Sequence, residues 1–161
     1  MRKTFEAIAL GALVFLFWIS YQALYGSAQL PKRIPTHFNL AGQPDGWGSS
    51  SSLMLLPVVA AGLYLLLTLG ALLPVSFKAP IRMTEENRSC LEALSHQMLA
   101  WLKMCLVCLF AWIQWSILDG VRKGSFHLSR AMIPLFLVAV SGGVGWHIMA
   151  MIRASRPGTC S

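Results

Sequence analysis

Four stretches of apolar residues, separated by more polar segments, dominate the pattern of the chain. They cover roughly Phe5–Leu24, Leu53–Val75, Met98–Leu118 and Ala131–Ile152. Since a helix rises about 1.5 Å per residue, about 20 residues cross the roughly 30 Å hydrocarbon core of a bilayer. None of the four shows the alternation of period two that is typical of membrane β-barrels. The pattern therefore predicts an all-α membrane protein, one domain with four transmembrane helices.

The composition supports this class. Of the 161 residues, 56% are hydrophobic and 12% are charged, whereas soluble domains have about 25% charged residues. The net charge of +7 would suggest a nucleic-acid partner in a soluble protein. Here Lys and Arg flank the apolar stretches, where they set topology and contact anionic headgroups. We therefore expect the lipid bilayer as a partner, and no nucleic acid.

The basic residues also predict an orientation. With the N terminus inside, seven Lys and Arg lie on the cytoplasmic side and five lie outside, and the side richer in basic residues is usually cytoplasmic. This places both termini and the loop of residues 76–97 in the cytoplasm. The loop of residues 26–52 would then lie outside.

The first apolar stretch has two interpretations. A basic start, Arg2 and Lys3, and the small residues Gly26, Ser27 and Ala28 are typical of a cleaved signal peptide. Its length and its terminal aromatic residues favour a retained helix, because such residues gather at membrane interfaces. The aromatic residues are Trp18, Tyr21 and Tyr25.

A further helix is predicted within the loop of residues 76–97. Thr84 is a residue type that caps helix N termini, and Glu85 and Glu86 would lie in the first turn, where the helix dipole favours acidic side chains. This helix would run from Glu85 to about His96 and continue into the third apolar stretch.

The loop of residues 26–52 is more elaborate than a plain connection between membrane helices. Pro31 and Pro35 fix their own φ and push the preceding residues toward extended conformations. Gly42 and the Asp45-Gly46 pair are typical of turns. The loop also carries apolar side chains, which favour packing of the loop back against the helices. We therefore expect an ordered extracytoplasmic loop with an extended first half.

The loop sequence LPKRIPTHFNLAGQPDGWGS resembles the signature of a bacterial family of small membrane proteins of unknown function. This family shares the N-terminal domain of the SdpI toxin-immunity protein. The matching residues are Leu30, Pro31, Ile34, Pro35, His37, Asn39, Gly42, Asp45 and Gly48. Family members often carry a lysine soon after the W-G-S turn, where this chain has only serines, and SdpI itself has further membrane helices.

The resemblance implies a protein of the bacterial cytoplasmic membrane that gives immunity to, or senses, an extracellular membrane-active peptide toxin. The loop motif would be the contact surface for this partner, and no catalytic residue or cofactor is expected. Two other functions stay open. One is a non-catalytic accessory subunit of a larger membrane complex, and the other is a metal-dependent membrane enzyme that uses the outside loops.

The loop pair His37 and Asp45 also has two interpretations. As a metal or proton site, the imidazole and the carboxylate would act together, completed by Asp119 and His127 from the other outside loop. As structural residues, His37 would bond to a backbone carbonyl and Asp45 would cap its turn. Thr36 as a nucleophile and His37 as its base would make a poor catalytic pair, because neighbouring residues on an extended strand point to opposite faces.

The third stretch carries four residues of chemical interest. Cys105 and Cys108 have redox or metal spacing, but small packing residues are the plainer interpretation. Lys103 is expected to extend its amine outward to the cytoplasmic interface, with a buried functional lysine as the alternative. Gln114 is expected to form an interhelical hydrogen bond.

The fourth stretch is rich in small residues. Ala139 with Gly143, and Ser141 with Gly145, are pairs that let another helix approach closely. This close approach would occur within the bundle or in a homo-oligomer or complex with a membrane partner. His147 is expected to lie at the cytoplasmic interface.

Overall fold

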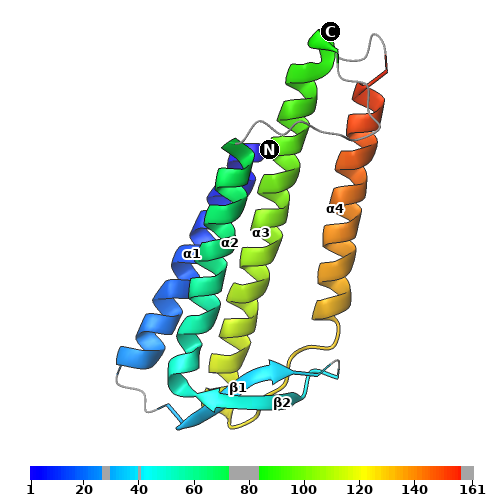
Figure 1. The fold of residues 1–161 in the computed structure, drawn as a ribbon. Helices are drawn as coiled ribbons and strands as arrows, with labels where there is room; N and C mark the ends of the chain where they lie inside the picture. The colour runs from blue at the N-terminus through cyan, green and yellow to red at the C-terminus, as the bar shows by residue number, and fades with distance from the viewer. Residues whose placement is uncertain (27–29, 40, 73–83, 157–161) are drawn as a thin grey trace.

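The computed structural model describes residues 1–26, 30–39, 41–72 and 84–156. Within these ranges the chain forms long helices and a β-hairpin (Figure 1). The elements in chain order are α1 (Arg2–Tyr25), β1 (Arg33–Phe38), β2 (Pro44–Ser49), the 3₁₀ helix η1 (Ser50–Met54), α2 (Leu55–Leu72), α3 (Glu85–Lys123) and α4 (Met132–Ala154).

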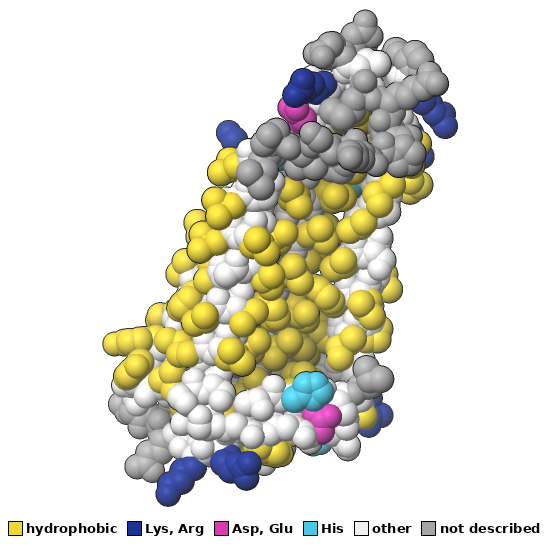
Figure 2. Space-filling view, in the orientation of Figure 1, with side chains coloured by type: hydrophobic (Ala, Val, Ile, Leu, Met, Phe, Trp, Pro, Cys, Tyr) yellow, Lys and Arg dark blue, Asp and Glu magenta, His cyan; other side chains and the backbone are white. Residues whose placement is uncertain are grey.

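Four of the described helices are long and apolar enough to cross a membrane, which confirms the prediction of a multi-pass membrane protein. They are α1, η1 joined to α2, most of α3, and α4. Their outer faces expose large apolar side chains, and Figure 2 shows these as a broad hydrophobic band along the helices. In water such a surface would be unusual, whereas lipid is its natural solvent.

The longest helix, α3, contains 39 residues and is continuous from Glu85 to Lys123. It begins at a capping box. The Thr84 side chain accepts from the backbone N–H of Asn87, and the Asn87 side chain accepts from the backbone N–H of Thr84. This confirms Thr84 as the cap. The helix expected at Glu85 to His96 is the beginning of α3, so this part of residues 76–97 is not a loop.

α3 is the central helix of the bundle. It packs against α1, α2 and α4, and Figure 1 shows the hairpin across the end of the bundle where α3 finishes. A cluster of buried residues at this end joins α1, the hairpin, η1 and α3. Its members are Ile19, Ile34, Leu53, Ile117 and Leu118. The hairpin is thus part of the hydrophobic core and not an appendage.

α4 comes close to α3 at Gly143. A Cβ atom on Gly143 would lie 2.1 Å from Nε1 of Trp101, so only glycine fits this contact. Nothing lies within 4 Å of the corresponding positions on Gly142 and Gly145, and Ser141 is exposed. Gly143, one member of the first small-residue pair, therefore faces the bundle, while Ser141 of the second pair faces away from it.

Two residues expected near the membrane interface have buried side chains. Lys103 is 1% exposed and His147 is 3% exposed. His147 binds through Nδ1 to the carbonyl oxygen of Gly143 at 2.7 Å, while its Nε2 is buried without a hydrogen-bond partner among the described residues. Lys103 finds partners on two neighbouring helices, as described below. For Lys103 the expectation of an outward amine was wrong and the alternative, a buried lysine, is what the structure shows. Its partners lie on other helices and are not visible in a local sequence pattern.

Candidate functional site

The hairpin is an antiparallel pair in which Ile34 lies opposite Gly48 and Pro35 lies opposite Trp47. Its first strand is extended where Pro31 and Pro35 predicted it. Ile34 is 1% exposed and packs with the core at this end of the bundle. Ile34 therefore anchors the first strand to the helices.

The turn between the strands is held by Asn39. Its Oδ1 accepts hydrogen bonds from the backbone N–H of Ala41 at 2.9 Å and of Gln43 at 3.0 Å. Gly42 has φ +73°, and its carbonyl oxygen accepts from the N–H of Leu128 at 2.9 Å. These bonds tie the tip of the hairpin to the connection between α3 and α4.

Gly42→Ala should loosen this attachment. The new Cβ would lie 2.2 Å from the carbonyl oxygen of Leu128, and the positive φ disfavours any L side chain. We expect a loss of more than about 2 kcal/mol in the free energy of unfolding, since strain and a clash add together. Faster amide hydrogen exchange at Leu128 would show the detachment.

Gly124→Ala is the matched control for this variant. Gly124 also has positive φ, at +68°, but nothing lies within 4 Å of its Cβ position. It should lose only about 1 kcal/mol from backbone strain. Equal losses at the two positions would contradict a specific contact at Gly42.

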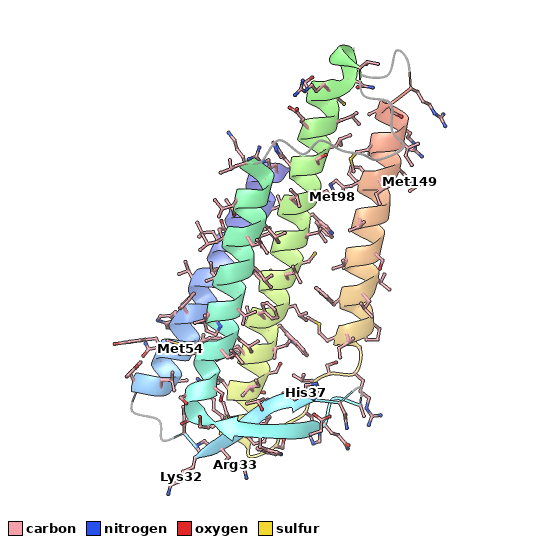
Figure 3. The ribbon with its side chains drawn as sticks, in the orientation of Figure 1. Lys32, Arg33, His37, Met54, Met98 and Met149 are labelled. Carbon is pink, nitrogen blue, oxygen red and sulfur yellow. The ribbon has the colours of Figure 1, made fainter. Side chains whose placement is uncertain are left out.

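His37 and Asp45 form a direct pair, with Nδ1 and Oδ1 2.5 Å apart. This differs from the structural interpretation of the sequence, in which His37 bonded to a backbone carbonyl and Asp45 capped its turn. Asn39 makes the side-chain bonds of the turn instead. The His37 side chain is 74% exposed and that of Asp45 is 43% exposed, and Figure 3 shows His37 on the hairpin near the end of the helices. The pair is a polar, solvent-facing feature.

An apolar cavity of about 450 Å³ lies beside this pair. Its walls come from β1, the η1–α2 junction, α3 and the first turns of α4, and Figure 2 shows the hydrophobic surface hollowed above the hairpin. His37 and Thr36 lie on its hairpin side, while Trp112, Ile133 and Phe136 are among its apolar walls. This volume is within the usual range of ligand pockets, about 300–1,000 Å³.

Gln114 also lines the cavity and is fully buried. Its Nε2 donates to Oγ of Ser20 on α1 at 2.9 Å and to the carbonyl oxygen of Leu53 on η1 at 3.1 Å. This confirms the interhelical hydrogen bond expected for Gln114. The amide joins α3, α1 and η1 near the hairpin end of the bundle.

The four residues of the hypothetical metal site do not gather. Asp119 binds Lys123 at 2.7 Å and shares a separate depression with His127, whereas His37 and Asp45 do not line that depression. Across the described ranges, no group of three or more His, Cys, Asp and Glu side chains is placed to hold a metal ion. Cys105 and Cys108 are free and half-buried on α3. The described residues therefore do not assemble the hypothetical metal site.

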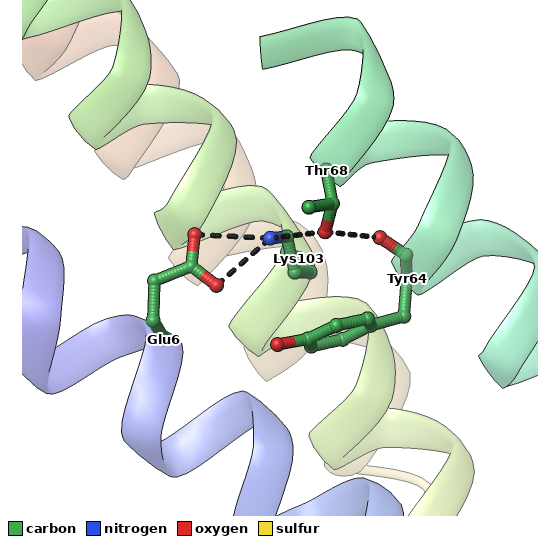
Figure 4. Close-up of polar contacts among 4 residues, drawn as sticks. All are labelled: Glu6, Tyr64, Thr68 and Lys103. Atoms are coloured by element: carbon green, nitrogen blue, oxygen red, sulfur yellow. Dashed lines mark hydrogen bonds and ion pairs between the residues drawn. The ribbon is translucent and has the colours of Figure 1, made fainter. Parts of the chain in front are cut away.

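A second polar centre, missed by the sequence analysis, surrounds Lys103 (Figure 4). Its Nζ lies 2.8 and 2.9 Å from the two carboxylate oxygens of Glu6 on α1. It donates to Oγ1 of Thr68 on α2 at 2.8 Å and lies 4.6 Å from the ring centre of Tyr64. The amine is therefore paired inside the bundle and does not reach outward. One signal was available, namely that Tyr64 and Thr68 lie four residues apart on one face of α2.

Residues 7–61 match the model of a domain of unknown function, DUF1648. The match takes in most of α1, the hairpin and the beginning of α2. An uncharacterized protein of Archaeoglobus fulgidus is 26% identical to the chain over 155 residues, which are 88% of this chain and 84% of that protein. No solved structure matches the chain.

Only part of the candidate site lies within the residues that match DUF1648. The hairpin residues His37, Asn39, Gly42 and Asp45 lie within the matched range. Gln114 and the rest of α3, together with α4, lie beyond it. The hairpin is thus the part of the site that this chain shares with the domain, while one wall of the cavity is built from residues outside the match.

Proposed function

We propose that the protein is an SdpI-like membrane protein that binds an extracellular membrane-active peptide and gives immunity to it or senses it. The observation that carries this proposal is the apolar cavity between the hairpin and the helices, which His37 of the His37–Asp45 pair helps to line. The cavity is the site where an apolar part of the peptide would bind. The hairpin pair would meet its polar part.

The chemistry of such peptides fits this arrangement. Membrane-active peptides are commonly amphipathic and basic, with an apolar face that enters the bilayer. Amphipathic helices are recognised by apolar grooves that take their projecting side chains. The cavity offers apolar walls from α3 and α4, and the Asp45 carboxylate offers a partner for a basic side chain. The resemblance of the hairpin motif to the SdpI family supports the same function.

The proposed orientation follows from this function. The hairpin would face the outside of a bacterial cytoplasmic membrane, and both termini would lie in the cytoplasm. The arrangement agrees with the distribution of Lys and Arg in the sequence. A peptide arriving from outside would then meet the hairpin before it reached the helices.

Expression in a peptide-sensitive bacterium tests the proposal. Cells carrying the protein are challenged with SdpC-type peptides, and survival and membrane potential are measured. We expect protection by the wild type, and its loss in Ile133→Trp, which fills the cavity from α4. The double variant His37→Ala, Asp45→Asn should weaken protection, since it removes the polar pair without changing the apolar walls.

Leu65→Trp is the matched control for the cavity variant. Leu65 lies on α2, is 59% exposed, and does not line the cavity. It should protect as well as the wild type at equal expression. Equal protection by Ile133→Trp would rule out the cavity as the binding site, and failure of the wild type to protect would remove this peptide class as the target.

A second candidate function is that of an accessory subunit of a membrane complex. The open positions at Gly142 and Gly145, beside the exposed Ser141, favour it, because small residues on a membrane helix allow another helix to approach. A fixed partner that co-purifies in mild detergent, and is lost on Ser141→Leu, would support this function. A lone monomer would contradict it.

A further inference from the structure

The cavity beside the hairpin opens sideways, toward the lipid. Two of its walls, Leu55 on α2 and Leu137 on α4, are 62% and 57% exposed and belong to the outer surface of the helices. Figure 2 shows the hollow within the hydrophobic band of the molecule. Its deeper walls include Leu109 and Ile113 on α3, which are half-buried. Because the mouth lies in the hydrophobic band, an occupant enters from the bilayer and not from water.

The cavity has nearly the length of a lipid chain in one leaflet. Leu109 and Ile117 mark its extent along α3, and they lie eight positions apart in the sequence. This separation is about 12 Å at about 1.5 Å per helical residue. One leaflet contributes about half of the roughly 30 Å hydrocarbon core, or about 15 Å. An acyl chain lying along α3 would therefore fill the cavity from its hairpin end toward the middle of the bilayer.

The apolar walls favour such a chain over other occupants. Walls of this kind gain dispersion contacts from a chain that packs on them. Water would find few hydrogen-bond partners there, because most of the lining side chains are apolar. Lipid tails are as apolar as leucine and surround the helices of a membrane protein. The bilayer itself therefore supplies a chain that suits the cavity.

Polar side chains from β1 and η1 line the hairpin end of the cavity. They are Thr36, His37 and Ser52. The strand register shifts on both sides of His37, and such irregularities re-aim side chains, so Thr36 and His37 can line one cavity. The Asp45 carboxylate lies against His37. Hydrogen-bond donors and an acidic group thus stand together where the headgroup of a lipid in the cavity would lie.

We propose that the cavity binds a phospholipid whose headgroup joins a phosphate to a primary ammonium, namely phosphatidylethanolamine. One acyl chain lies along α3, and the phosphate accepts hydrogen bonds from the hydroxyls of Thr36 and Ser52. The ammonium binds the Asp45 carboxylate through a charge-assisted hydrogen bond. Phosphatidylglycerol offers the same phosphate but no positive charge for Asp45. This inference goes beyond the proposed function and does not rest on it, since a peptide would enter the cavity by displacing the lipid.

Nuclear Overhauser effects between lipid and protein test the proposal. The protein carries protonated Ile and Leu methyl groups in a deuterated background, within nanodiscs of deuterated phosphatidylglycerol. A few per cent of protonated phosphatidylethanolamine is added, and the acyl-chain signal at Ile113 is divided by the signal at Leu65, which is 59% exposed on α2. We expect a ratio roughly fivefold higher than with protonated phosphatidylglycerol, the effect of about one hydrogen bond.

Matched variants locate the two parts of the site. Ile133→Trp fills the cavity from α4 and should remove the Ile113 signal, while Val138→Trp, at an exposed position of α4 outside the cavity, should keep it. Asp45→Asn should reduce the preference for phosphatidylethanolamine to about one, because the charge partner of the ammonium is lost. Asp119→Asn removes a carboxylate that does not line this cavity and should keep the preference. If Ile133→Trp does not fold, the two lipids on the wild type and on Asp45→Asn still decide the question.

Equal ratios for the two lipids, a preference that survives Asp45→Asn, or an Ile113 signal that persists in folded Ile133→Trp would overturn the lipid site. The peptide challenge is decided separately. Protection of cells, combined with no lipid preference, would refute the lipid site and leave the proposed function standing. A lipid preference without protection would do the reverse.

Discussion

Replacing Glu6 by Gln should lower the free energy of unfolding by about 3 kcal/mol, because it leaves the Lys103 amine buried without its counter-charge. The Lys103 side chain is 2% exposed and that of Glu6 is 32% exposed. Lys103 would keep its bond to Thr68 and its place over Tyr64, but neither contact carries a full negative charge. Unfolding by a denaturing detergent, followed by helix content, measures the loss.

Two further variants separate the buried pair from ordinary surface charges. Replacing Glu6 and Lys103 together by Met should recover most of the loss, because a buried ion pair and an apolar pair of similar size are often close in stability. Asp119→Asn breaks the exposed pair with Lys123 and should cost no more than about 1 kcal/mol. A loss in Glu6→Gln as small as that in Asp119→Asn would contradict the buried-charge explanation.

Gly143→Ala should loosen α4 from α3. The added Cβ would lie 2.1 and 2.6 Å from two atoms of the Trp101 ring, so the ring or the helix must move. Overpacking of this kind costs about 1–3 kcal/mol. Cross-linking between cysteines introduced on α3 and α4 should become slower, and the free energy of unfolding should fall.

Gly145→Ala makes the same chemical change two residues further along α4, where nothing lies within 4 Å of the new Cβ. It should raise the free energy of unfolding by about 0.5–1 kcal/mol, because alanine favours the helix more than glycine does. The two substitutions therefore have opposite signs. A loss at both positions would show that the helix itself, and not the Trp101 contact, requires glycine.

The sequence was sufficient for the membrane spans because their signal is local. A run of about 20 apolar residues is long enough to cross a bilayer, and in lipid it must form a helix to pair its backbone groups. Thr84 marks the beginning of α3, because its own side chain caps the helix. The pairing of β1 with β2 was not predicted. Proline and glycine are poor strand residues, so Pro35 and Gly48 indicated extension and turns without revealing that their two segments pair as the strands of a hairpin.

The candidate site was predicted less well, because its parts come from distant positions. Gln114 was expected to bond between helices, but nothing in the sequence named Ser20 or Leu53 as partners. Lys103 and Glu6 are 97 positions apart, and each alone resembles a residue near a membrane boundary. The cavity depends on how α4 packs against α3 and on where the hairpin contacts the helices. Both are tertiary contacts between segments far apart in the sequence.

The unbroken length of α3 has a mechanical consequence. At 39 residues it is about 58 Å long, almost twice the roughly 30 Å of a hydrocarbon core. One rigid rod therefore carries a cavity wall near one end and the capping box at the other. A tilt of about 5° about the hairpin end would displace the far end by about 5 Å, a lever movement set by this helix length. Such a tilt at the hairpin end would therefore also move the capping box at the other end of α3.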